Sequence, residues 1–133
     1  MIEPVLKKIV LRGEPEDIND FVLGANADIG IDGREGVEYF YFRIITPKRL
    51  AKLLETDRIV DGRATFIIYE ANMESNLRLV ECQIKKILED CRRESRNEVA
   101  KAINRYLEWE YDNIEYETLD NAYAKLSPSK NII

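Results

Sequence analysis

The chain has 133 residues, with 20 Lys and Arg against 25 Asp and Glu, so that its formal net charge is -5. This length fits a single domain, and the excess of acidic residues argues against nucleic acid as a direct partner, because phosphate binding needs clustered Lys and Arg. Histidine is absent, which excludes Ser-His-Asp and Cys-His catalysis and any zinc site that needs imidazole.

The sequence also lacks the signals of membrane proteins and secreted proteins. No apolar run approaches the ~18 to 20 residues of a membrane span, and the first residues lack the basic-then-apolar order of a secretory signal. We therefore expect a cytoplasmic protein with no membrane partner. Cys82 and Cys91 are nine residues apart in one predicted helix, too far for a disulfide, so we expect two reduced thiols.

The first third of the chain predicts strands. Residues 5–11 are short, apolar and rich in β-branched side chains, and the sequence Arg-Gly-Glu-Pro at 12–15 stops them. Residues 16–26 favour a short turn or an irregular connection. Residues 28–32 alternate, and the sequence Asp-Gly-Arg-Glu-Gly at 32–36 suits the turn of a hairpin.

Residues 37–46 give the strongest strand signal of the sequence. Their alternation puts Phe40, Phe42 and Ile44 on one face, which we expect to be buried, and leaves the other face half exposed. Residues 64–69 form a further predicted strand. It is apolar on both sides, which predicts a central position in the sheet.

Three helices are predicted. Thr46 followed by Pro47 is typical of a helix start and begins a short amphipathic helix. Apolar residues at helical spacing over 73–91 predict the longest helix. The capping-box pattern Ser-Arg-Asn-Glu at 95–98 begins another. The expected buried face of this last helix consists of Val99, Ala102, Ile103, Tyr106 and Leu107.

This order of elements predicts an α+β fold, in which a largely antiparallel sheet of about four strands carries the C-terminal helices on one face. A parallel doubly wound fold would need helices between most strands. We expect one domain over residues 1–133, with a frayed end at about 127–133. The expected core, in or near its centre, contains Phe40, Phe42, Ile44, Phe66, Ile68, Val80, Ile84, Ile87, Ile103 and Leu107.

No motif indicates a catalytic centre, a metal site or a cofactor. The sequence contains neither the glycine-rich dinucleotide fingerprint nor the phosphate-binding loop, and the acidic hairpin lacks the spacing of a calcium loop. A pair of carboxylates could serve a glycosidase without histidine, but the sequence marks no acidic residue as buried. We therefore predict a protein that is not an enzyme, with a carboxylate hydrolase as a remaining alternative.

Two stretches of the chain are strongly acidic. Between Glu14 and Glu38, eight acidic residues accompany one base, Arg34, and between Glu108 and Asp120 there is no base at all. Either stretch can be a solvated face or a docking surface for a basic partner. The second also contains aromatic residues, so we take it as the candidate partner-binding surface, although Trp109 could equally plug the edge of the core. Its residues are Glu108, Trp109, Glu110, Tyr111, Asp112, Glu115, Tyr116, Glu117 and Asp120.

Two stretches of the chain resemble the immunity protein 8 family. Residues 36–50 resemble that family's pattern of a glycine, an acid, an alternating aromatic strand, then Thr-Pro-Lys and a leucine that opens a short helix. Residues 106–111, Tyr-Leu-Glu-Trp-Glu-Tyr, are similar to its helix-ending Trp-Glu-aromatic element. The chain departs from the family at Arg49, where the family often has tryptophan. If that tryptophan serves partner binding in the family, the surface here has diverged.

The resemblance implies an antitoxin of bacterial polymorphic toxin systems, which include contact-dependent inhibition. Such a protein binds and blocks a cognate toxin domain without catalysis. Many of these toxin domains are nucleases with basic clefts, which an acidic surface could plug. The alternative is a non-catalytic adaptor or regulatory domain that binds another protein or a small ligand. A neighbouring toxin gene would favour immunity and a metabolic operon the adaptor, while the toxin and the oligomeric state stay open.

Overall fold

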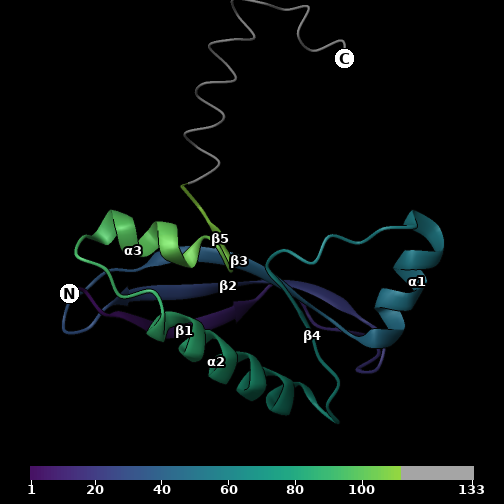
Figure 1. Ribbon diagram of the computed structural model, residues 1–133. Helices are drawn as coiled ribbons and strands as arrows, with labels where there is room; N and C mark the ends of the chain where they lie inside the picture. The colour runs from purple at the N-terminus through teal and green to yellow at the C-terminus, as the bar shows by residue number, and fades with distance from the viewer. Residues whose placement is uncertain (112–133) are drawn as a thin grey trace, which may run out of the picture.

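The computed structural model describes residues 1–111, which form an α+β fold with a five-stranded, mostly antiparallel sheet and three helices (Figure 1). The predicted fold class is confirmed. None of the described helices is long and apolar enough to span a lipid bilayer. In chain order the elements are β1 (Pro4–Leu11), β2 (Val22–Ile31), β3 (Glu38–Ile45), α1 (Pro47–Asp57), β4 (Thr65–Ile67), α2 (Met73–Glu89), α3 (Arg96–Ile103) and β5 (Glu108–Trp109).

Strand β3 lies at the centre of the sheet. The strand order is β1-β2-β3-β4, and both β1 with β2 and β2 with β3 pair antiparallel. The other edge of β3 is shared by two short strands. β4 pairs with it in parallel at residues 43–45, and β5 pairs with it antiparallel at Phe40 and Tyr41. β5, the last strand of the described residues, therefore lies beside the middle of β3.

Strand β2 covers part of the segment 16–26, for which we expected an irregular connection, so that expectation is wrong. Glycine, alanine and asparagine have low strand propensity, but β2 is paired along both edges, with β1 and with β3. Ala25 and Ala27 are buried opposite Phe42 and Phe40. The small residues leave room for the large rings beside them, and this packing overrides the local preference of the sequence.

Strand β4 is shorter and less central than predicted from residues 64–69. It has three residues and forms the end of the strand order, paired with β3. Only one side of this apolar segment packs against the core. Phe66 packs edge-to-face on Phe42 with a centroid separation of 5.5 Å, whereas Ile67 and Tyr69 are exposed to solvent.

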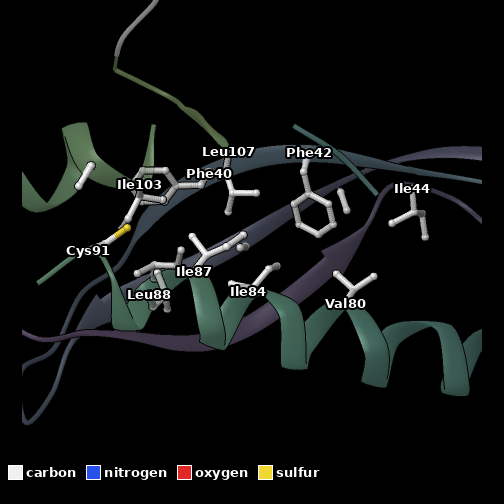
Figure 2. Packing of buried hydrophobic residues seen from close by; sticks show 14 of the residues in the cluster. Phe40, Phe42, Ile44, Val80, Ile84, Ile87, Leu88, Cys91, Ile103 and Leu107 are labelled. Atoms are coloured by element: carbon white, nitrogen blue, oxygen red, sulfur yellow. The ribbon is translucent and has the colours of Figure 1, made fainter. Parts of the chain in front are cut away.

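The core joins one face of the sheet to α2 and α3 (Figure 2). Phe40 and Phe42 point from β3 toward α2, and Val80 and Ile84 point back from the helix. Each of these four side chains is buried. All of the predicted core residues are buried in this cluster or pack against it, so the predicted faces of the central strand and of the long helix are confirmed.

Helix α3 begins as predicted and ends early. The Ser95 hydroxyl accepts a hydrogen bond from the Glu98 backbone N–H at 3.2 Å, which is one half of the predicted capping box. Tyr106, expected to be buried, is 45% exposed. The helix ends at Ile103 and the chain turns there, so the helical spacing no longer applies. Leu107 enters the core after that turn.

Helix α1 lies at the opposite end of the sheet from α3 (Figure 1) and has no buried residue. Thr46 caps it as predicted, because its side-chain oxygen accepts from the Arg49 backbone N–H. The Asp20 carboxylate, which precedes β2, accepts from Arg49 Nε at 2.6 Å and also pairs with the Lys52 ammonium group. These ion pairs tie α1 to the start of β2. Arg49 therefore has a structural role.

Because Asp20 must be ionised to form these ion pairs, the stability of the folded protein should depend on pH. Hydrogen bonds from Lys52 and Arg49, against the opposing effect of burial, lower the pKa of Asp20 below its ordinary value. A lowered pKa in the folded state stabilises the protein above the unfolded-state value of about 3.9, and this stabilisation is lost as the pH falls through the folded-state value. We expect Asp20→Asn to lower the unfolding temperature at pH 7. The gap between variant and wild type should narrow below pH 4 in calorimetry, and a gap that stays constant down to pH 2 would contradict this account.

Truncation of a core ring should test the assigned faces of β3. Phe42 is buried between the sheet and α2 and contacts Phe66. We expect Phe42→Ala to lower the free energy of unfolding by about 3 to 5 kcal/mol, a large part of the roughly 5 to 15 kcal/mol of a typical domain. Urea denaturation measures this change. Tyr39→Ala, on the exposed face of the same strand, is the control, and equal effects of the two variants would refute the assignment.

Candidate functional site

The structure describes the first four residues of the candidate partner-binding surface, Glu108 to Tyr111. The other five residues lie outside the described part of the chain; they are Asp112, Glu115, Tyr116, Glu117 and Asp120. The resemblance implied that the described residues end a helix, but in the structure they do not. They form β5 and the turn after it, and four residues separate β5 from the end of α3.

Pairing with β3 fixes the direction of the side chains of β5. Trp109 lies opposite Phe40, and Glu108 lies opposite Tyr41. Directly opposite residues project to the same side of a sheet. Since Phe40 belongs to the core, Trp109 projects toward the helices, and Glu108 projects to the face that carries Tyr41.

Trp109 is half-buried and packs against the core cluster, in agreement with the alternative of a plug at the core edge. Its backbone N–H donates to Asn104 Oδ1 at 2.8 Å. The ring of Tyr111 meets the indole edge-on, with centroids 5.9 Å apart. The indole Nε1 is buried and has no hydrogen-bond acceptor within residues 1–111. Trp109 therefore fixes the segment to the domain, while Tyr111 remains 46% exposed.

Glu110 is partly committed to the backbone of β3. Its backbone N–H donates to the Tyr39 carbonyl at 3.1 Å, and its Oε1 accepts from the Tyr39 backbone N–H at 3.2 Å. Glu38 lies close by. Burial, and to a lesser degree the negative charge of Glu110, raise the pKa of the Glu38 carboxyl, and Arg96 opposes this shift. Two carboxyl groups are thus held near each other at the edge where β5 joins the sheet.

The competing acidic stretch between Glu14 and Glu38 does not form one surface. Asp20 is ion-paired, and Asp28 is buried on β2, where it accepts from the Asn26 amide at 2.7 Å. The exposed acids are divided between two loops at opposite ends of β2. Glu14, Glu16 and Asp17 precede the strand, and Asp32 and Glu35 follow it.

The two buried aspartates do not form the carboxylate pair of a glycosidase. Such a pair needs two acids ~5 to 9 Å apart in one cleft. Asp20 lies before the start of β2, and six residues of extended strand, ~20 Å, separate Val22 from Asp28. Over residues 1–111, no three His, Cys, Asp or Glu side chains are grouped so that they could hold a metal ion.

Sequence reasoning missed a groove that we name the arginine groove. It has a volume of about 500 Å³, and Arg12, Tyr41, Arg43, Arg63, Asp61 and Glu108 contribute to its lining. Tyr41 and Arg43 project from β3 on the face opposite the core, and the Arg12 guanidinium lies 4.5 Å above the centre of the Tyr41 ring. The three arginines come from separate parts of the chain, so no local run of basic residues marks the site. The alternation of side chains along residues 37–46 was the signal in the sequence for this groove, because it placed Tyr41 and Arg43 on the half-exposed face.

Comparison with known proteins bears on the function. No curated protein and no solved structure matches the chain. A family model described as immunity protein 8 matches residues 7–114, which include most of β1, the other four strands and all three helices. An immunity protein has, in general, a toxin-neutralising role. Because the match covers well over half of the sequence, the chain belongs to the immunity protein 8 family.

Proposed function

We propose that this protein neutralises one cognate toxin domain by stoichiometric binding, without catalysis, in the cytoplasm of the cell that makes it. Membership of the immunity protein 8 family carries this proposal. The chain has no histidine for acid–base chemistry near neutral pH. Its two buried aspartates serve structural contacts, Asp20 with α1 and Asp28 with Asn26. These features support binding as the mode of action.

The proposed toxin-binding surface is the stretch from Glu108 to Asp120, together with the part of the sheet beside it. Trp109 packs against the core and can hold the start of the stretch in place. Tyr111, and Tyr39 on the adjacent strand, are 46% and 41% exposed. Exposed tyrosines are frequent energetic centres of protein interfaces. The acidic residues of the stretch suit a toxin with a basic cleft, such as a nuclease, because opposite charges accelerate encounter.

The stoichiometry of neutralisation should distinguish binding from catalysis. When a fixed amount of the toxin domain is titrated with this protein, we expect residual toxin activity to fall linearly and to reach zero at a fixed ratio near one to one. Calorimetric titration should give the same ratio. Complete neutralisation at a small fraction of one equivalent would contradict the proposal, because only a catalyst acts repeatedly.

Charge reversal should test the acidic stretch. We expect Asp112→Lys combined with Glu115→Lys to slow association with the toxin domain roughly tenfold or more, and to reduce the dependence of the rate on salt. Stopped-flow binding measures the rate. The unfolding temperature, measured in parallel, separates a loss of binding from a loss of folding. Glu110 is left unchanged because its carboxylate bonds to the Tyr39 backbone.

The matched control reverses two acids of the competing stretch, Glu14→Lys with Glu16→Lys. Both side chains are exposed, and the change in net charge is the same. Asp20 is unsuitable for this control because its ion pairs hold α1. Weaker binding in the control alone would move the interface to the loop between β1 and β2. Unchanged binding in both variants would refute electrostatic attraction as the basis of recognition.

A further inference from the structure

The arginine groove crosses the face of the sheet that the helices leave open. Strand pairing places the residues of the groove beside one another across neighbouring strands. Tyr41 of β3 lies between Asn26 of β2 and Glu108 of β5, and the Arg12 backbone N–H donates to the Gly24 carbonyl, next to Arg43. α2 and α3 belong to the core cluster on the other face. The groove is therefore lined by residues of β3 and β5, by Arg12 directly after β1, and by Asp61 and Arg63 just before β4.

The guanidinium groups of Arg43 and Arg63 donate hydrogen bonds to neutral acceptors. Arg43 donates to the Thr65 hydroxyl and to the Asp61 carbonyl, and Arg63 donates to the Asn104 carbonyl and amide oxygen. These acceptors are neutral. Within residues 1–111, no carboxylate forms an ion pair with Arg12, Arg43 or Arg63. A carboxylate from outside could therefore meet charged donors that are already positioned.

The lining favours acidic side chains of a protein over a nucleic acid. Asp61 and Glu108 lie in the same groove, and Asp28 lines the hollow beside it. These carboxylates would repel a continuous run of phosphates but can alternate with the charges of a folded partner. Tyr41 and Tyr39, together with the arginines, supply the residue types that dominate protein interfaces. The groove has three arginines against two carboxylates, so it is a local positive site on a protein whose net charge is -5.

We propose that the arginine groove binds Asp or Glu side chains of the toxin domain, as a second, oppositely charged part of the interface. This inference rests on the proposed function and adds to it the chemistry of the partner's surface. The partner then carries a basic region for the acidic stretch and an acidic region for the groove. Such alternating charge fixes the orientation of the partner and excludes toxins whose charges are placed differently.

Arg12 is the residue to change, because it is exposed and its guanidinium group lies over the Tyr41 ring. We expect Arg12→Glu to weaken binding of the toxin domain encoded by the neighbouring gene at least about tenfold, mainly through faster dissociation. The control is Lys86→Glu, an exposed position on α2 with the same change of charge. It should bind within about threefold of the wild type. Arg63→Gln, which removes charge but can still hydrogen bond to Asn104, should also weaken binding.

The outcomes separate the two proposals. A wild-type protein that fails to bind the toxin domain would overturn the proposed function and this inference with it. Binding by the wild type with no loss in Arg12→Glu and Arg63→Gln would overturn the groove alone, as would an equal loss in Lys86→Glu. A labelled oligouridine that binds the wild type at physiological salt, and is released by Arg12→Glu, would assign the groove to nucleic acid instead. The unfolding temperatures of all variants are measured to confirm that they are folded.

Discussion

The alternation of side chains along β3 is the constraint on which the rest of this structure depends. Phe40, Phe42 and Ile44 face α2 and form the centre of the core, while Tyr39, Tyr41 and Arg43 form the centre of the open face. β3 pairs along one edge with β2 and along the other with β4 and β5. A shift of one residue in its register would exchange the two faces completely. The strand therefore specifies the fold and the exposed surface together.

The helices contribute to this arrangement in different ways. α2 and α3 bury apolar side chains against β3, so their positions follow from the hydrophobic pattern of the sequence. α1 buries none and is connected to β2 by Asp20 and its two cations. An exposed helix with polar connections can change its surface without disturbing the core. Arg49 illustrates such a polar connection, because its guanidinium group pairs with Asp20 at the start of β2.

Much of the fold could be predicted from the sequence, since the strongest local signals also agree with the tertiary contacts. The strand around Phe42, the cap at Thr46 and the capping box at Ser95 are examples. The errors occur where tertiary pairing decides the structure. β2 contains residues with weak strand propensity and forms because it pairs with a strand along both edges. β5 lies where the sequence predicted the end of a helix, and it forms because it pairs with β3. The candidate site could be predicted only in part, for the same reason. A run of acids is visible in a sequence, whereas Arg12, Arg43 and Arg63 meet only through strand register.

The same alternation determines which functional changes can be made without loss of stability. Side chains of the open face have no packing role in the core, so Arg12 and Tyr39 can vary while the fold is retained. Glu110 and Arg43 differ from them, because their polar contacts also fasten β5 and β4 to β3. Changes in the first group should therefore leave the fold intact, whereas changes in the second group require a compensating contact. Trp109 lies at the boundary, since its ring belongs to the core while the residue after it belongs to the exposed edge. The start of the acidic stretch is thus fixed by the core, and the pairing of β5 with β3 sets the direction of Glu108 and Trp109.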